Sequence, residues 1–300
     1  MSAIPFNRDA SAVPGVVETL SPLVRRVVAP NPGPFTFTGT NTFIVGHGEV
    51  AVIDPGPPLK AHLEALTEAL KGETVRHILV THTHADHSPL ARPLKERMGG
   101  QIGGAAPERV SAPVTGAAVE EENDIGFQPE RRLGDADTIT GAGWTLEALT
   151  TPGHTQNHLC YALKEENTLF TGDHVMGWST SVVAPPDGDM AAYLESLEKV
   201  RARAFARLRP AHGGPVDAPD PFLAAYYEHR LAREAQILEA LKRGPSTIQA
   251  LVPDLYKGVD RALHGAAALS VHAHLIRLTA LGATASEGPP TLTARYMLSR

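Results

Sequence analysis

The sequence predicts an α+β protein, with strands and helices layered over residues 1–217 and a small helical domain over residues 218–300. Three observations support this prediction. Short apolar segments typical of strands recur in the first part and alternate with segments of helical spacing. Several of these strands end in turns that carry histidine or aspartate. After residue 217 three helical segments follow one another, with only one short strand pattern near the end of the chain.

The first expected elements are two strands and a helix. Residues 43–45 and 50–53 are continuous runs of β-branched, aromatic and small apolar residues, which predict buried strands. The second run ends at the turn 54–56. Residues 59–70 carry leucines at positions 63, 66 and 70, a spacing that predicts a helix.

The next elements flank a histidine-rich turn. Residues 75–80 predict a strand, and residues 89–98 predict a helix that stops at two glycines. Residues 101–132 are rich in Gly, Ala and Pro and include an acidic stretch at 120–122. We expect this segment to be an irregular surface connection, because long loops of this kind often carry function.

The rest of the first domain repeats the pattern of strands and turns. Residues 144–149, 159–163 and 168–170 predict strands. Residues 190–205 predict a helix, and residues 208–214 predict a short strand that runs into a glycine turn.

The C-terminal part reads as a winged-helix type of domain. Residues 219–243, 246–255 and 259–281 predict three helices. A turn-rich link at 284–290 and a final strand at 291–297 are expected to follow.

Composition narrows the class of protein. The chain has 300 residues, of which 42% are hydrophobic and 20% charged, as in ordinary soluble globular proteins. No apolar run approaches the roughly 20 residues of a membrane-spanning helix. Residues 1–13 lack the pattern of a secretory signal. The single cysteine, Cys160, excludes an internal disulfide framework. We therefore expect a cytoplasmic protein without a membrane partner.

Charge is distributed unevenly along the chain. The formal net charge is −6. Residues 218–300 contain nine Lys and Arg against seven Asp and Glu, whereas residues 1–217 contain 18 against 26. With this net charge, the molecule as a whole does not attract nucleic acid electrostatically. The slightly basic tail is a weak sign of a separate module.

The most informative motif follows the strand at 75–80. His82, His84, Asp86 and His87 lie within six residues of one another, directly after this strand. Imidazole suits zinc and similar metals, and an adjacent carboxylate is typical of a catalytic rather than a thiolate structural site. The motif therefore predicts a catalytic metal centre.

Three further candidate ligands, at other strand ends, complete a dinuclear set: His154, Asp173 and His212. On geometric grounds His82, His84 and His154 would hold one metal, while Asp86, His87 and His212 would hold a second that Asp173 bridges to the first. Two zinc ions are expected, although manganese or iron is also compatible with these ligands. The nucleophile would then be a hydroxide bound to both metals, which assigns catalytic roles to Asp86 and Asp173.

These motifs resemble the metallo-β-lactamase superfamily. The resemblance rests on segments 52–56, 81–87, 151–155, 172–173 and 211–213, and it covers about residues 18–217. It implies an αββα sandwich with the metals at one edge and a ligand set similar to that of glyoxalase II and tRNase Z. Zinc β-lactamases commonly use a cysteine ligand, and Cys160 matches no ligand position, so the resemblance argues against hydrolysis of antibiotics.

The tail resembles a more specific group. Segments 226–238, 251–255 and 272–281 are similar to the C-terminal winged-helix domain of β-lactamase-like endoribonucleases. The resemblance divides the chain into a metal hydrolase domain, 1–217, and a winged-helix-like domain, 218–300.

Several residues near the motifs are candidates for supporting roles. Asp54 is expected to orient a ligand histidine, and His158 to pack beside the site. His174 is compatible with either a position facing the substrate or a structural one. Three residues are candidates for lining the substrate pocket: Trp178, Ser179 and Thr180.

Two substrates remain open for a dinuclear zinc hydrolase. Single-stranded RNA is suggested by the winged-helix tail and its slight basicity. A small ester, thioester or lactone is suggested by the acidic first part and by the absence of the large RNA-gripping insertions seen in tRNase Z.

A metal-sensing or DNA-binding regulator is the alternative from another class. The last helix has only Arg261 and Arg277 as cations, so duplex DNA is an unlikely partner. We instead expect the C-terminal helices to pack against the first domain or to form a homodimer. A solvated helix face is expected for four cations: Arg230, Arg233, Lys242 and Arg243.

Overall fold

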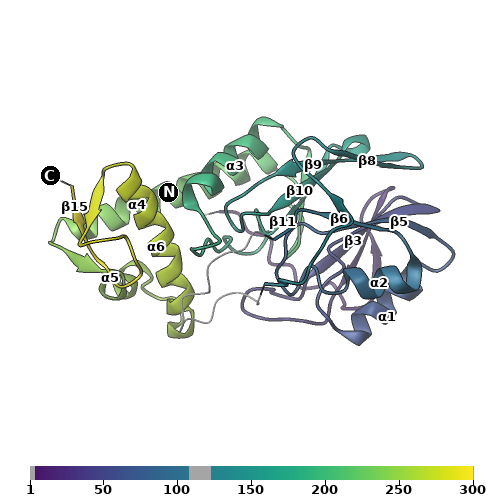
Figure 1. The fold of residues 1–300 in the computed structure, drawn as a ribbon, viewed down its shortest axis with the longest axis horizontal. Coiled ribbons are helices and arrows are strands. Elements are labelled where there is room, and N and C mark those ends of the chain that lie inside the picture. Colours follow the sequence, from purple (N-terminus) through teal and green to yellow (C-terminus); the bar gives the residue numbers. More distant parts are fainter. Residues whose placement is uncertain (1–3, 108–122, 300) are drawn as a thin grey trace.

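The computed structural model describes residues 4–107 and 123–299. Two β-sheets lie face to face, helices cover their outer surfaces, and a C-terminal lobe lies at one end of the sandwich (Figure 1). This is the expected αββα sandwich followed by a small C-terminal domain.

The first sheet has seven strands in the order of the chain. Its strands are β1 (Val17–Thr19), β2 (Val24–Val28), β3 (Asn41–Val45), β4 (Glu49–Ile53), β5 (Thr74–Leu79), β6 (Gln101–Gly104) and β7 (Arg131–Arg132). Strands β4 to β7 run parallel, and helices α1 (Lys60–Ala69) and α2 (Ala91–Met98) connect β4 to β5 and β5 to β6. Parallel strands require such crossovers, which place the carboxyl ends of β4 and β5 at the same sheet edge.

The second sheet has five strands in the order β12-β11-β10-β9-β8. They are β8 (Thr138–Gly141), β9 (Trp144–Thr150), β10 (Leu159–Leu163), β11 (Thr168–Gly172) and β12 (Arg207–Pro210). A short 3-10 helix, η1 (Lys164–Glu166), follows β10, and helix α3 (Met190–Ala202) follows β11. Because β11 and β12 are parallel, their carboxyl ends also meet at one edge.

The main core fills the space between the sheets. Phe43 of β3 and Phe170 of β11 lie with ring centroids 5.0 Å apart. Buried Tyr161 donates a hydrogen bond from its hydroxyl to the Val80 carbonyl, 2.8 Å away, at the end of β5. The sandwich therefore holds strand β5, and the turn that follows it, against the second sheet.

The C-terminal lobe contains three helices and a small sheet. The helices are α4 (Pro219–Leu241), α5 (Ile248–Leu255) and α6 (His264–Ala280), with a 3-10 turn η2 (Arg261–Leu263) before α6. Strands β13 (Ser246–Thr247), β14 (Thr284–Ser286) and β15 (Arg295–Leu298) pair in the order β13-β15-β14.

Helix α4 joins the lobe to the sandwich. Phe222 and Tyr226 in its first half pack into the core beneath α3, whereas Ile237 and Leu241 in its second half pack into the core of the lobe. The helix thus belongs to two cores. This arrangement agrees with the expectation that the C-terminal helices pack against the first domain. The domain division at residue 217 and the homodimer remain predictions.

Some expected elements differ from those observed. Residues 101–104 and 131–132 form strands β6 and β7 rather than an irregular connection, and residues 284–286 form β14 rather than a link. These strands are two to four residues long, and they exist through pairing with distant strands rather than through a local pattern. Residues 108–122 of the expected loop, which include its acidic stretch, lie outside the described residues.

Four further strands have no counterpart among the expected strands: β1, β2, β8 and β13, the last of which takes the first two residues of the expected helix at 246–255. Arg230 is also buried, with 3% of its surface exposed, rather than solvated, whereas Lys242 and Arg243 are exposed as expected. Within the described ranges, no helix combines the length and hydropathy that a bilayer crossing requires.

Replacement of Asp189 by alanine is expected to lower the free energy of unfolding by about 1 kcal/mol. The Asp189 carboxylate caps α3 by accepting hydrogen bonds from the backbone N–H groups of Ala191 and Ala192, at 2.7 and 3.0 Å. Urea denaturation measures the effect, and Glu195→Ala on the exposed face of the same helix is the control. Equal stability of the two variants would contradict the capping role.

Candidate metal centre

All seven candidate ligands lie at one edge of the sandwich, in turns that follow strand ends. Four come from the turn after β5, one from the turn after β9, one from the turn after β11 and one from the turn after β12: His82, His84, Asp86, His87, His154, Asp173 and His212. The structure therefore brings together every ligand that the sequence predicts, although these residues span 131 positions of the chain.

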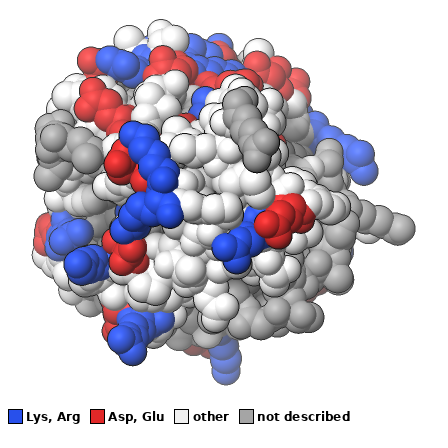
Figure 2. Space-filling model, turned by 90° about the vertical axis from the view of Figure 1, so that its left-hand side faces the viewer, with Lys and Arg blue, Asp and Glu red and all other residues white. Residues whose placement is uncertain are grey.

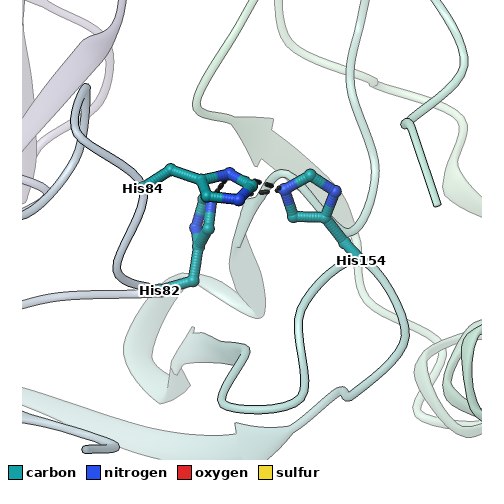
Figure 3. Close-up of side chains that lie close together, drawn as sticks. All are labelled: His82, His84 and His154. Atoms are coloured by element: carbon teal, nitrogen blue, oxygen red, sulfur yellow. Dashed lines mark hydrogen bonds between the residues drawn. The ribbon is translucent and has the colours of Figure 1, made fainter. Parts of the chain in front are cut away.

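The first group consists of His82, His84 and His154 (Figure 3). The Nε2 atom of His82 lies 3.0 Å from Nδ1 of His84, and Nε2 of His154 lies 3.3 and 3.1 Å from these two atoms. Three ring nitrogens thus point toward one another from two separate turns (Figure 3). Ligand nitrogens around a tetrahedral zinc ion, each 2.0–2.1 Å away, lie about 3.3 Å apart, so these residues fit one metal ion.

The second group consists of Asp86, His87 and His212. The Oδ2 atom of Asp86 lies 3.3 Å from Nε2 of His87 and 3.1 Å from Nε2 of His212. Asp173 lies beside this group, with Oδ1 3.6 Å from His87 Nε2 and 3.3 Å from His212 Nε2. Its carboxylate also clusters with His82 of the first group, so Asp173 stands between the two groups.

Two buried atoms, His87 Nε2 of the second group and Asp173 Oδ1 beside it, lie close to oppositely charged groups but form no hydrogen bond to a described residue. Buried polar atoms are rarely left without a partner, because desolvation without compensation costs free energy. A cation between these atoms would compensate both of them. The donor set therefore fits a second metal ion, and N and O ligands of this kind suit zinc as well as manganese or iron.

The electrostatic environment of the two groups differs. Burial, together with neighbouring His154, lowers the pKa of His84 to about 3, so its ring is neutral, which is the form that binds metal. Burial acts to lower the pKa of His212, but Asp173 and Asp86 raise it well above its ordinary value. The same carboxylates that hold a proton on His212 create a negative field that favours a metal cation.

Asp54 holds His87 in place, from a buried position after β4. Its Oδ2 atom lies 3.0 Å from His87 Nδ1, which leaves Nε2 to face the centre. Its carboxylate also accepts hydrogen bonds from the backbone N–H and the hydroxyl of Thr81, each at 2.8 Å. Asp54 itself has a positive φ of 50°, which is uncommon outside glycine. Its geometry suits the orienting role expected from the sequence.

His158 supports Asp173 rather than facing the candidate ligand atoms. Its Nε2 atom accepts a hydrogen bond from the Asp173 backbone N–H at 3.2 Å, and its Nδ1 atom lies 2.9 Å from the Thr151 hydroxyl. Gly172 adopts a positive φ of 49°, and a Cβ atom there would lie 2.7 Å from His158 Nε2. A side chain at position 172 would therefore push His158 away from Asp173.

His174 is fully buried against Tyr193, with ring centroids 5.1 Å apart, so the structure favours a packing role for it over a position facing substrate. Trp178 is half-buried and stacks on Phe37, with ring centroids 5.0 Å apart. Ser179 and Thr180 are half-buried in the same loop. Pocket lining by residues 178–180 remains a prediction.

Two supporting contacts have no sequence motif to mark them. The Thr40 hydroxyl donates a hydrogen bond to Oδ2 of Asp86 at 3.0 Å. The Val182 carbonyl lies 2.7 Å from Nδ1 of His154. The first partner precedes β3 and the second uses only its backbone, so neither residue type nor spacing identifies them before the fold is known.

A family model described as the metallo-beta-lactamase superfamily matches residues 35–212, more than half of the chain. The chain belongs to this superfamily. A second model, described as a beta-lactamase associated winged helix domain, matches residues 247–289. These matches confirm the fold class, the winged-helix type of the C-terminal lobe and the assignment of the protein as a metallo-β-lactamase-fold hydrolase.

Curated relatives and solved structures agree with this assignment. The chain is 32% identical over 239 residues to the lactamase-like protein adaB of Aspergillus niger, covering 78% of this chain and 68% of the relative. It is 32% identical over 256 residues to an atrochrysone carboxyl ACP thioesterase of Aspergillus chevalieri, covering 80% and 75%. A beta-lactamase domain protein from Burkholderia ambifaria has the same fold, with a TM-score of 0.81 at 22% identity over 98% of this chain and 97% of that one.

Asp54→Asn is expected to weaken metal binding about 10- to 100-fold. The amide would place a nitrogen donor where Oδ2 now faces the protonated Nδ1 of His87. Zinc titration against a chromogenic chelator measures the change. The control is Asp135→Asn, a surface carboxylate that accepts a hydrogen bond from Thr150 N–H at 2.9 Å. Unchanged zinc affinity in folded Asp54→Asn would exclude the orienting role.

Proposed function

We propose that this protein is a dinuclear zinc hydrolase that cleaves the thioester bond of a small acyl substrate. The observation that carries the proposal is the pair of adjacent ligand groups with Asp173 between them. Such pairs are typical of sites that hold two metals about 3.5–4 Å apart.

The two groups of residues at the site would bind different metal ions. His82, His84 and His154 would hold one ion through their ring nitrogens, while Asp86, His87 and His212 would hold the other. When bound, two such ions supply a water activated as a nucleophile and polarise the carbonyl oxygen of the substrate. Thr40 and Asp54 keep their ligands in a fixed orientation, so that little reorganisation accompanies metal and substrate binding.

Relatives support a thioester as the substrate class. The name of the Aspergillus chevalieri relative, and that of a second one from Aspergillus terreus that is 31% identical over 262 residues, describes a thioesterase acting on an acyl carrier protein. A thioester carbonyl is a suitable target for a polarising metal pair, because attack on it develops negative charge on oxygen.

The surface charge of the C-terminal lobe argues against RNA as the substrate. On the face at this end of the molecule, Lys and Arg side chains lie beside Asp and Glu side chains, with broad uncharged areas between them (Figure 2). The lobe has ion pairs between Arg243 and Asp254, 3.1 Å apart, and between Arg277 and Glu234, 2.6 Å apart. Cations that are already paired contribute little to phosphate binding.

The purified protein is expected to hydrolyse a short acyl thioester at a rate that changes less than about twofold between about 50 and 200 mM salt. Neutral small substrates lose no counterions on binding, whereas RNA binding weakens steeply with salt. Thiol release measured with a chromogenic reagent tests this, with single-stranded RNA and a lactone assayed in parallel. RNA cleavage that falls with salt, without thioester turnover, would instead indicate a ribonuclease.

His84→Ala is expected to reduce thioester turnover at least about 100-fold and to lower zinc content, because the first group loses one of its three nitrogens. His47→Ala, an exposed histidine whose ring bonds to the Pro22 carbonyl at 2.9 Å, is the matched control. Chelator treatment should abolish activity in the wild type, and added zinc should restore it. Full activity in folded His84→Ala would contradict the assignment of the first ligand group.

A further inference from the structure

The orientation of His154 depends on the loop between β11 and α3. Val182 in this loop places its carbonyl oxygen 2.7 Å from His154 Nδ1. A carbonyl only accepts hydrogen bonds, so Nδ1 must carry the proton. The Nε2 atom of His154 is then the nitrogen available to a metal, and it is the atom that faces His82 and His84.

Helix α4 of the C-terminal part holds this loop at two places. The guanidinium of Arg230 donates a hydrogen bond to the Ser181 carbonyl at 2.5 Å, one peptide unit before Val182. One turn earlier on the same face, the Tyr226 hydroxyl accepts a hydrogen bond from the Met176 N–H at 3.1 Å and contacts the Ser179 carbonyl. The loop is therefore attached to α4 along its first half and at its middle, up to the residue directly before Val182.

Pairing with a carboxylate does not explain why Arg230 is buried. Its guanidinium lies over the Tyr193 ring, 4.9 Å from the centroid, and its Nε atom has no hydrogen-bond partner. Within the part of the chain that the structure describes, no carboxylate pairs with it, whereas Arg277 of the same lobe pairs with Glu234. Burying a cation without a counter-ion costs free energy, so its bond to the loop needs a reason other than stability.

We propose that Arg230 is a positioning residue for the metal centre, acting on the ligand His154 through the Ser181–Val182 peptide. The proposal rests on the proposed metal site. Arg230 fixes the Ser181 carbonyl, and this in turn fixes the adjacent Val182 carbonyl that orients the His154 ring. The winged-helix lobe thereby takes part in forming the first ligand group without contributing a ligand.

Arg230→Gln in the full chain tests the proposal. The stripped protein is titrated with zinc against a chromogenic chelator, and circular dichroism confirms that the variant is folded. We expect the dissociation constant of one of two zinc ions to rise about 10- to 100-fold and the other to change less. Arg233→Gln is the matched control, because Arg233 lies on the same helix but donates to the Leu255 carbonyl at 2.5 Å, within the lobe.

A double-mutant cycle separates action through His154 from general loosening. In a His154→Ala background, Arg230→Gln is expected to have no further effect on zinc binding, because the group it orients is gone. An equal effect of Arg230→Gln in both backgrounds overturns the proposal, as does wild-type zinc affinity in folded Arg230→Gln.

If Arg230→Gln does not fold, a milder substitution at the same position tests the proposal. Arg230→Lys keeps the cation but loses the planar guanidinium that lies over Tyr193, so a weakening of about 3- to 10-fold is expected. Wild-type affinity in this variant overturns the proposal. A wild-type protein that binds no zinc would contradict the proposed function itself. If the wild type binds two zinc ions and the Arg230 variants bind them with the same affinity, only this inference is contradicted.

Discussion

Burial of a dense cluster of polar ligands is the constraint on which the rest of this structure depends. Six of the seven candidate ligands are buried, and His84 is half-buried, at one edge of the sandwich. Such a cluster is stable only if each side chain is held by hydrogen bonds or by a cation. The sandwich meets this requirement with contacts from both sheets, from the Asp54 carboxylate on His87 to the His158 ring on the backbone of Asp173.

The two ligand groups meet this constraint in different ways. In the first group, three histidine nitrogens lie close together, burial lowers the pKa of His84 so that its ring is neutral, and the backbone carbonyl of Val182 accepts a hydrogen bond from His154. In the second group, the carboxylates of Asp86 and Asp173 lie against histidines and create a negative field. The first group thus presents ring nitrogens that are fixed in place, and the second presents negatively charged carboxylates, a combination that suits two cations close together.

The C-terminal lobe is coupled to this edge through α4. The helix packs its first half into the core beneath α3 and its second half into the core of the lobe, so the two cores share one rigid element. The same helix face carries Tyr226 and Arg230, which reach the loop beside His154. Under the role proposed for Arg230, the lobe contributes to the geometry of the candidate metal site through these contacts.

The sequence by itself determined the candidate ligands, the sandwich strands that carry them and the helical character of the tail. These features are local: the ligands His82, His84, Asp86 and His87 follow one apolar strand within a few residues, and periodicity defines the longer helices. The tertiary structure decided what depends on contacts between distant residues. Strands β6, β7 and β14 are too short to have a pattern of their own. Thr40, the Val182 carbonyl and buried Arg230 acquire their roles only when segments 28 to 49 residues apart along the chain meet near the site, because hydrogen bonding between them depends on position and not on local sequence.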